Sequence, residues 1–143
     1  MKFSQFTVGQ TFYTEPYCFT EEEILQFARR YDPQFFHVDS RLAAETGLFD
    51  GMIASGFHTL SAMWGQFIRL GLYGEDGRAG IGMDEIRWKK PVFPGDTLSA
   101  AVEITDLTPT RSGKSGIVTM HFVVKNQRDE LVMQFRTSGI LAN

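Results

Sequence analysis

The stretch that most constrains the fold is ASGFHTLSAMWGQFIRLGL, residues 54–72. Its large apolar side chains recur at the spacing of a helix, and the opposite side of that helix is scarcely more polar. A helix that is apolar on nearly all sides is stable only when other elements surround it. We therefore expect a buried central helix that begins at Ser55 or Gly56, with its periodic positions at Phe57, Leu60, Ser61, Trp64, Ile68 and Gly71.

The second half of the chain alternates between apolar and polar residues with a period of two, which is typical of antiparallel strands with one buried face. FPGD, TRSGKS and NQRDE are interpreted as turns between these strands, and the glycine-rich GEDGRAG before them as a further turn. The pattern predicts an α+β fold in which a curved antiparallel sheet wraps around the helix. The expected inward-facing residues are Leu98, Ala100, Val102 and Ile104, then Val118, Met120, Phe122 and Val124, then Leu131, Met133 and Phe135, with the same rhythm around Ile86 and Trp88.

The first third of the chain carries clear start and stop signals for helices. Thr20 followed by Glu23 forms a capping box, and Pro33 disfavours helical geometry at the residue before it. Asp39 can cap a second helix, and Gly47 can close it. The expected elements are a short strand within 12–18, a helix from Thr20 to Asp32 and a short helix from Asp39 through Ala44.

Composition limits the classes of function. The 143 residues suit one domain, 1–143, and 43% hydrophobic residues allow an ordinary core. A net charge of −3 gives no electrostatic reason to expect nucleic acid or an anionic membrane as a partner. The single cysteine, Cys18, excludes an internal disulfide and suits a reducing cytoplasm. We expect no membrane span and no signal peptide, because no apolar run is long enough and MKFSQFTVGQ lacks the necessary apolar core.

The segment RRYDPQFFHVD, residues 29–39, places Asp32 and His37 among large aromatic side chains. A carboxylate within hydrogen-bonding distance of an imidazole can orient it or share its action on a water molecule. The alternative is structural: Asp32 caps a turn and His37 is a satisfied, partly buried histidine. The pattern alone favours the structural alternative.

The segment ASGFHT opens the central helix with a serine and a glycine. The unpaired N–H groups at a helix start suit an oxygen that gains negative charge, and Gly56 lets a ligand approach its N–H closely. The simpler interpretation makes Ser55 the capping residue, and the two are compatible because a helix start has several free donors.

The remaining candidates are weaker. We interpret His58 as a packing residue, His121 as a surface residue and Cys18 as structural. No spacing of His, Cys and carboxylates indicates a metal site, and no phosphate-binding glycine motif is present.

Three blocks in order, YDPQFFHVD, ASGFHT and MDEIRWKKPVFPGDTL, resemble the MaoC-like dehydratase family, the (R)-specific enoyl-CoA hydratases, over about residues 8–140. The resemblance implies a hotdog fold, a sheet wrapped around a long helix. It also implies a catalytic pair at Asp32 and His37 and an oxyanion donor at the backbone N–H of Gly56. The positions expected to contact substrate are Gln34, Phe36, Ser55 and Phe57.

The loop departs from the family's usual Asp-x-Asn-Pro-x-His pattern. Gln34 stands where the asparagine is usual, and Pro33 has moved forward by two positions. Ser55 precedes the helix glycine where a histidine is frequent. The acid–base pair is intact, so these changes concern the shape of the loop and the choice of substrate.

The implied reaction is addition of water to a 2-enoyl thioester, or its reverse, with coenzyme A or acyl carrier protein as carrier and no separate cofactor. The resemblance also implies a homodimer with the site at the interface. Two alternatives stay open. A hotdog thioesterase would need a carboxylate on the central helix, and residues 56–72 contain none. A non-catalytic acyl-binding protein is the other.

Overall fold

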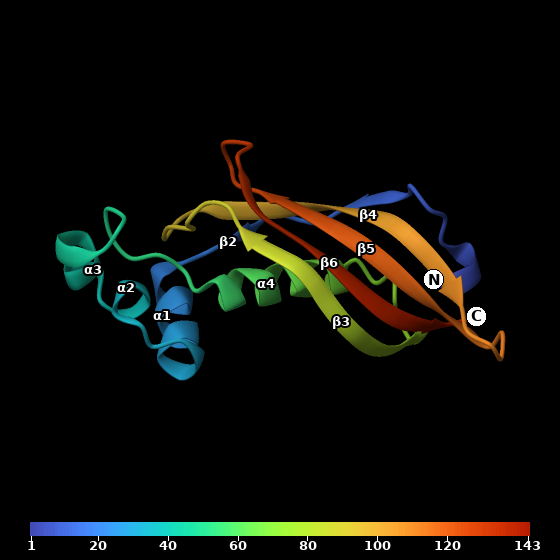
Figure 1. Cartoon of the computed structure of the whole chain (residues 1–143). Helices are drawn as coiled ribbons and strands as arrows, with labels where there is room; N and C mark the ends of the chain where they lie inside the picture. Colours follow the sequence, from blue (N-terminus) through green and yellow to red (C-terminus); the bar gives the residue numbers. More distant parts are fainter.

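The computed structural model describes residues 1–143 and shows one curved antiparallel sheet with a helix along its concave face (Figure 1). The helices α1, α2 and α3 gather beyond one end of the sheet, and both chain termini lie at the other. In chain order the elements are a 3-10 turn Phe3–Gln5, β1 Thr11–Tyr13, β2 Tyr17–Cys18, α1 Glu21–Tyr31, α2 Phe35–Val38, α3 Ser40–Thr46, α4 Gly56–Arg69, β3 Gly77–Trp88, β4 Thr97–Pro109, β5 Ser115–Lys125 and β6 Leu131–Ala142. The predicted α+β hotdog architecture is confirmed.

The sheet has the strand order β1-β4-β5-β6-β3, and β2 pairs with β4 beside β1. The inward-facing residues predicted for β4 and β5 are all buried. In β6, Met133 and Phe135 face inward as predicted, but Val132 is also buried and Leu131 only half-buried. The register between β5 and β6 shifts at this point, which disturbs the simple alternation.

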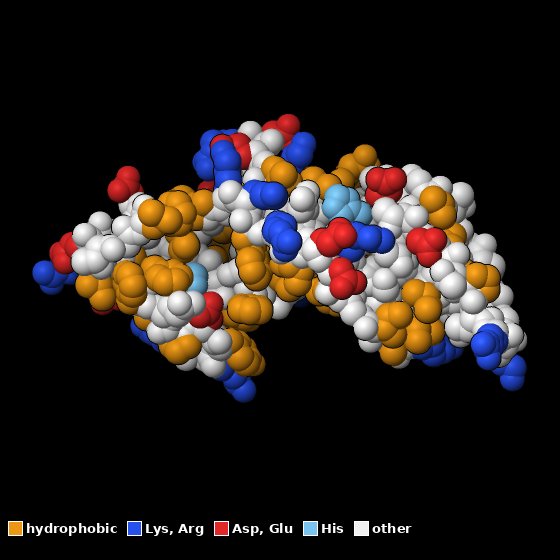
Figure 2. Space-filling model, viewed as in Figure 1, with side chains coloured by type: hydrophobic (Ala, Val, Ile, Leu, Met, Phe, Trp, Pro, Cys, Tyr) orange, Lys and Arg blue, Asp and Glu red, His pale blue; other side chains and the backbone are white.

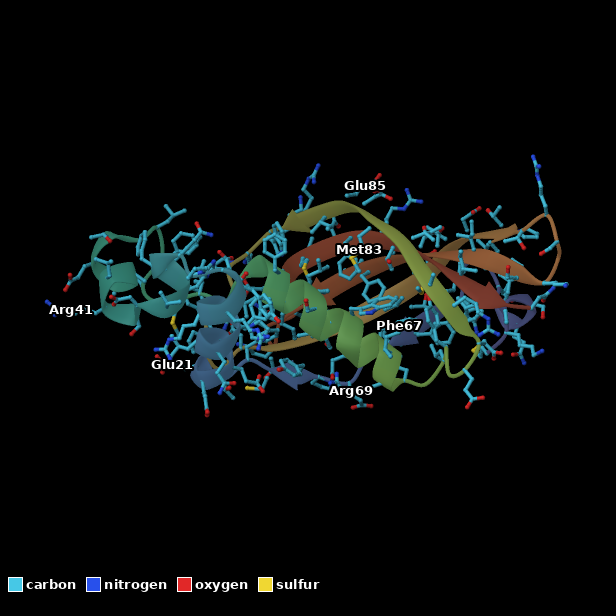
Figure 3. All side chains as sticks on the ribbon, turned by 90° about the horizontal axis from the view of Figure 1, so that it is seen from below. Glu21, Arg41, Phe67, Arg69, Met83 and Glu85 are labelled. Atoms are coloured by element: carbon cyan, nitrogen blue, oxygen red, sulfur yellow. The ribbon has the colours of Figure 1, made fainter.

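The core forms where α4 packs against the middle of the sheet. Phe67 of α4 is fully buried and lies 5.4 Å, centroid to centroid, from Phe122 of β5. Phe122 in turn stacks on Phe135 of β6 at 4.4 Å. Aromatic contacts at these distances stabilise beyond the burial of their area. Figure 3 shows α4 lying along the sheet, with Phe67 near its C-terminal end.

The helix α4 is buried on one face only. It starts at Gly56 with Ser55 as its cap, as predicted, and ends at Arg69, before Leu72. Thr59, Met63 and Phe67 face the sheet, whereas Phe57 and Ile68 are exposed. The prediction of a helix buried on all sides is therefore wrong for a single chain.

The strand β3 departs most from prediction. It begins at Gly77, so the second half of GEDGRAG, which we interpreted as a turn, is extended strand. β3 pairs only with β6, and almost all of its residues are exposed. The alternation expected around Ile86 and Trp88 is interrupted at Glu85, whose φ of 54° accompanies a bulge.

The first third of the chain follows most of its predicted signals. The Thr20 side chain accepts from the Glu23 N–H, and α1 ends before Asp32. The Glu23 carboxylate does not complete the capping box but accepts from the Tyr17 hydroxyl. The strand expected within 12–18 is divided into β1 and β2, and α3, capped by Asp39, continues to Thr46. The single turn α2 was not predicted.

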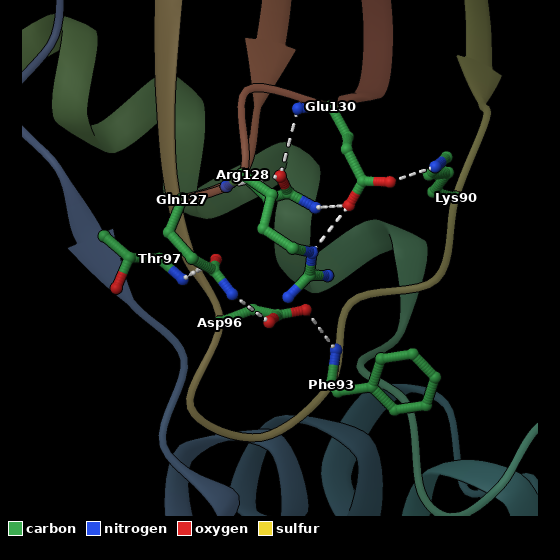
Figure 4. Close-up of polar contacts among 8 residues, drawn as sticks. Lys90, Phe93, Asp96, Thr97, Gln127, Arg128 and Glu130 are labelled. Atoms are coloured by element: carbon green, nitrogen blue, oxygen red, sulfur yellow. Dashed lines mark hydrogen bonds and ion pairs between the residues drawn. The ribbon is translucent and has the colours of Figure 1, made fainter.

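A polar network ties the β5–β6 turn to the segment 89–96 (Figure 4). Glu130 accepts from Lys90, from Arg128 and from Asn126, and these hydrogen bonds lower the pKa of Glu130 to about 2. The buried Asp96 accepts from the Phe93 N–H at 2.9 Å and from the Gln127 amide at 2.8 Å. These hydrogen bonds therefore hold the segment 89–96 in place against the β5–β6 turn.

None of the helices combines the length and the hydropathy that a membrane span requires.

We expect Asp96→Ala to lower the free energy of unfolding by about 1–3 kcal/mol, because it leaves the half-buried Phe93 N–H and the Gln127 amide without their acceptor. Urea denaturation followed by circular dichroism measures the loss. Asp106→Ala, which removes an exposed carboxylate bonded to Thr108, serves as the control and should change stability by less than about 0.5 kcal/mol. Equal stabilities for wild type and Asp96→Ala would contradict this account of the network.

Candidate active site

Asp32 lies where α1 ends and faces the start of α4. The Ser55 hydroxyl donates to Asp32 Oδ2 at 2.7 Å, and the Gln34 amide donates to Asp32 Oδ1 at 2.8 Å. Pro33 cannot continue the helix, so the chain turns at Asp32 and directs its carboxylate away from α1. Asp32 lies 23 positions before Ser55, so this hydrogen bond joins the end of α1 to the start of α4.

These hydrogen bonds determine the charge of the carboxylate. Burial raises the pKa of Asp32, but the hydrogen bonds from Ser55 and Gln34 and the neighbouring His37 ring outweigh burial. The pKa of Asp32 is therefore below its usual value, and the side chain is ionised at neutral pH.

His37 lies on α2, where it is 4% exposed. Its Nδ1 is 2.7 Å from the Ile53 carbonyl oxygen. A carbonyl oxygen only accepts, so Nδ1 carries a proton and donates to Ile53. Its Nε2 lies 3.3 Å from Asp32 Oδ2. In the neutral ring Nε2 is then an acceptor that faces a second acceptor.

Two facing acceptors can be satisfied in two ways. A proton on Nε2 makes an ion pair with Asp32, or a water molecule donates one O–H to each group. A water held in the second way is polarised by a carboxylate and an imidazole together, and either group can take its proton. The arrangement is therefore suited to acid–base chemistry on water.

Gly56 supplies a free donor beside this pair. As the first residue of α4, it has an N–H that meets no acceptor within the protein. The indole N–H of Trp88 donates to the Gly56 carbonyl at 3.1 Å. A Cβ at position 56 would overlap the Trp88 ring, so only glycine fits here. The unpaired N–H sits at the positive end of the α4 dipole.

A cleft of about 350 Å³ brings these groups together. Of the predicted site residues, Asp32, Gln34, His37, Gly56 and Phe57 line it. The rest of its wall comes from residues that sequence reasoning did not select: Phe49, Ile53, Ala54, Thr59, Trp88, Lys89, Lys90, Pro91 and Val92.

Two predicted contact residues lie outside the cleft. Ser55 is fully buried behind it and reaches it only through Asp32. Phe36 lines a separate neighbouring pocket and touches the cleft only through its edge contact with the His37 ring. Trp88 and the two lysines were missed as site residues, although they stand in the quoted block MDEIRWKKPVFPGDTL, because a strand pattern does not show which residues meet a distant helix.

The other candidates keep their structural interpretation. His58 is buried, stacks on Phe27 at 4.8 Å and contacts Phe19 edge to face. Burial lowers the pKa of His58, although Glu23 opposes the effect, and its Nδ1 has no hydrogen-bond partner. Cys18 is exposed and unpaired, and no three His, Cys, Asp or Glu side chains are grouped as metal ligands.

Comparison with known proteins gives a family match. A family model described as MaoC like domain matches residues 3–126. YdeM of Bacillus subtilis (strain 168), an uncharacterized protein, is 38% identical over 99% of both chains. The beta-methylmalyl-CoA dehydratase of Chloroflexus aurantiacus is 30% identical over 93% of this chain, but the match spans only 38% of that longer enzyme.

Solved structures agree with the architecture. The MaoC-like dehydratase from Rhodospirillum rubrum superposes with a TM-score of 0.90 at 30% identity, covering 100% of this chain and 97% of the other. The R-hydratase PhaJ1 from Pseudomonas aeruginosa gives a TM-score of 0.74 at 25% identity, covering 99% and 84%.

We expect Ser55→Ala to raise the pKa of Asp32, because it removes a hydrogen bond to the charged form. Titration of the Asp32 carboxyl by ¹³C NMR measures the change. The lowered pKa of Asp32 stabilises the folded state at every pH above the pKa of this side chain in the unfolded chain, which is about 3.9. The variant should therefore lose about 1.5–3 kcal/mol of stability at pH 7. Part of this loss should disappear as the pH falls through the folded pKa.

Ser61→Ala is the matched control, because Ser61 lies on the same helix and its hydroxyl donates only to the Phe57 carbonyl. An Asp32 titration identical in wild type and Ser55→Ala would show that the Ser55 hydroxyl does not set the charge of the carboxylate.

Proposed function

This chain belongs to the MaoC-like domain family, and we propose that it adds water to a 2-enoyl thioester of coenzyme A, or removes water from the 3-hydroxyacyl thioester. Similarity to a CoA dehydratase and to an R-hydratase supports a hydratase role. The observation that carries the proposal is the pair of facing acceptors on Asp32 and His37, in one cleft with the free N–H of Gly56.

In the proposed reaction, Asp32 and His37 hold one water. As its oxygen bonds to C3, the water gives up a proton to this pair, and the electrons of the C2=C3 bond move toward the thioester oxygen. The Gly56 N–H stabilises that enolate-like oxygen. The enolate then takes a proton at C2 from the protonated pair. Water adds without redox change, so no cofactor is needed beyond the coenzyme A portion of the substrate.

The surroundings of the cleft suit this substrate and carrier. Lys89 and Lys90 line the cleft. Lys90 is paired with Glu130, so Lys89 supplies the positive charge for a carrier that contains phosphate groups. Figure 2 shows Lys and Arg side chains beside the hollow in the surface. The exposed free thiol of Cys18 suits the reducing cytoplasm in which we place this enzyme.

The structure bears on the two alternative functions, a thioesterase and a non-catalytic acyl-binding protein. A thioesterase of this fold would use a carboxylate on the central helix, and α4 contains no Asp or Glu. A non-catalytic acyl-binding protein would not need the His37 tautomer fixed by Ile53, nor two acceptors held 3.3 Å apart. Both observations favour the hydratase.

We expect wild type to hydrate crotonyl-CoA, measured by the loss of enoyl absorbance, and Asp32→Asn and His37→Ala each to lower kcat by about 10²–10⁴-fold. Asp32→Asn removes the charge and basicity of the carboxylate, and His37→Ala removes the imidazole, so each variant loses one of the two groups that can take the proton of the water. Circular dichroism should show that both variants keep the wild-type fold. His121→Ala, a half-buried histidine on β5 outside the cleft, is the control and should retain its activity.

Three outcomes would contradict the proposal. Release of free thiol without hydration would identify a thioesterase. Binding of crotonyl-CoA without turnover would identify an acyl-binding protein. Full hydration by Asp32→Asn would remove Asp32 from the mechanism.

We further propose that two copies associate through β3 and the open face of α4. β3 is an edge strand with one unpaired side, and its side chains Ile81 and Met83 are exposed. Phe57 and Ile68 of α4 are exposed as well, and Figure 3 shows β3, with Met83, crossing beside α4. A long exposed edge with apolar neighbours is normally covered, and a two-fold pairing of identical strands covers both copies at once.

We expect light scattering coupled to size exclusion to give a dimer, and Ile81→Lys to give a monomer, because it buries a charge in the proposed interface. Val8→Lys places the same charge at an exposed apolar residue outside β3 and α4 and should remain dimeric. A wild-type monomer that hydrates crotonyl-CoA at full rate would refute the interface.

A further inference from the structure

The Gly56 carbonyl accepts hydrogen bonds from two side chains that come from different parts of the fold. The Trp88 indole N–H donates to it at 3.1 Å from the end of β3, and the Thr59 hydroxyl donates to it at 2.9 Å from one turn later in α4. A hydroxyl that bonds to a carbonyl three residues earlier is a local feature of helices. The bond from Trp88 is different, because it joins the sheet to a residue 32 positions earlier in the chain.

The backbone of Trp88 is held by the sheet. Trp88 lies opposite Met133 of β6, which is fully buried. The N–H of the next residue, Lys89, donates to the Val132 carbonyl at 2.7 Å. The indole therefore reaches the start of α4 from a backbone that is anchored outside that helix.

The Trp88 ring occupies the space that a side chain at position 56 would need. An ideal Cβ on Gly56 would lie 2.3 Å from Trp88 Cε2 and 2.6 Å from Trp88 Nε1. Gly56 does not have a positive φ, so its backbone conformation would accept an alanine if the ring were absent. The tryptophan, and not the local backbone conformation, therefore requires a glycine here.

The proposed oxyanion donor belongs to a residue that needs such a restraint. Glycine has more backbone freedom than any other residue, and Gly56 is the first residue of α4, where helices fray. The Gly56 N–H shares its peptide plane with the Ser55 carbonyl, which accepts from the N–H groups of His58 and Thr59. This plane keeps its orientation only while the first turn stays helical, and Trp88 restrains the residue on which that turn depends.

We propose that Trp88 is a positioning residue for hydration: it restrains Gly56 as a side chain would, and so keeps the Gly56 N–H directed at the thioester oxygen. This inference rests on the proposed hydratase function for the role of that N–H. A donor to a developing oxyanion contributes more in the transition state than in the bound substrate. Loss of the restraint therefore lowers kcat and leaves KM nearly unchanged.

Two variants divide the contact between Trp88 and Gly56 into its parts. Trp88→Phe keeps a ring over Gly56 and removes the indole N–H, whereas Trp88→Ala removes both. Trp88 is 48% exposed, so both variants should fold, which circular dichroism checks. With crotonyl-CoA we expect kcat to fall about 10-fold in Trp88→Phe and about 10²-fold in Trp88→Ala, the cost of a misplaced catalytic group, with KM within about twofold of wild type.

Trp64→Phe is the matched control. It makes the same change from indole to phenyl at the other tryptophan of the chain, which lies on α4 outside the cleft. This variant should keep the wild-type kcat and KM.

A second substitution at position 56 gives a test that a tryptophan with only a packing role would not pass. In wild type, Gly56→Ala drives a Cβ into the Trp88 ring and should lower kcat about 10-fold or more. In Trp88→Ala the same Cβ enters the vacated space and restrains the backbone of residue 56. Gly56→Ala should therefore raise the kcat of Trp88→Ala about two- to fivefold, the effect of a glycine-to-alanine restraint. The same substitution thus has opposite effects in the two backgrounds.

The Gly56 amide reports its own order by ¹⁵N NMR relaxation, without substrate. We expect an order parameter of about 0.85 in wild type and below about 0.6 in Trp88→Ala. Trp64→Phe should keep the wild-type value, and the double variant Gly56→Ala/Trp88→Ala should return toward it. This measurement does not depend on turnover.

The outcomes separate the two proposals. If wild type hydrates no enoyl-CoA but the Gly56 amide loses its order in Trp88→Ala, the hydratase function fails and the restraint of Gly56 by Trp88 stands. If wild type hydrates crotonyl-CoA and both Trp88 variants keep its kcat, or change KM alone, Trp88 is only a wall of the cleft and the positioning role is overturned. A lower kcat with an unchanged order parameter at Gly56 would overturn it as well.

Discussion

The rest of the structure depends on the packing of α4 against the concave face of the sheet. Phe67 meets the stacked rings of Phe122 and Phe135, and this contact fixes the helix along its length. A helix held in this way presents its N-terminus at one end of the sheet, where β3 ends at Trp88. Trp88 then covers Gly56 so closely that no side chain can be placed there. The packing of the core thus positions the Gly56 N–H, the backbone donor of the site.

The site is assembled from segments that are distant in sequence. Ser55 accepts from the Phe57 N–H to cap α4 and donates to Asp32 at the end of α1, so one hydroxyl stabilises the helix and lowers the pKa of the carboxyl group. Ile53, two residues earlier, fixes the tautomer of His37. Ser55 and Ile53 both lie directly before α4. A shift of the helix would therefore move the Asp32 carboxylate and the His37 imidazole together. The polar network around Asp96 and Glu130 holds the segment 89–96, which contributes residues to the wall of the cleft.

Predictions from the sequence succeeded where the relevant interactions are local or periodic. The cap at Thr20, the end of α1 before Pro33 and the start of α4 at Ser55 depend on neighbouring residues. Predictions from the sequence failed where a contact outside the local pattern determines the structure. Glu23 bonds to Tyr17 in place of its own helix start, and the glycines after residue 76 form an edge strand because β6 offers them a partner. Phe36, which we expected to contact substrate, lies on the unpredicted turn α2 and lines the pocket beside the cleft.

The amino-acid sequence by itself determined the order of the elements, the buried faces of β4 and β5 and the candidates Asp32, His37 and Gly56, since helix signals, alternation and motif spacing are properties of short segments. Only the tertiary structure decided that these three line one cleft, that Ser55 acts from behind it, and that Trp88, Lys89 and Lys90 complete its wall. It also decided that α4 is covered on one face only. The physical reason is that hydrogen bonds and cavities depend on distances across the fold, and a linear pattern does not contain those distances.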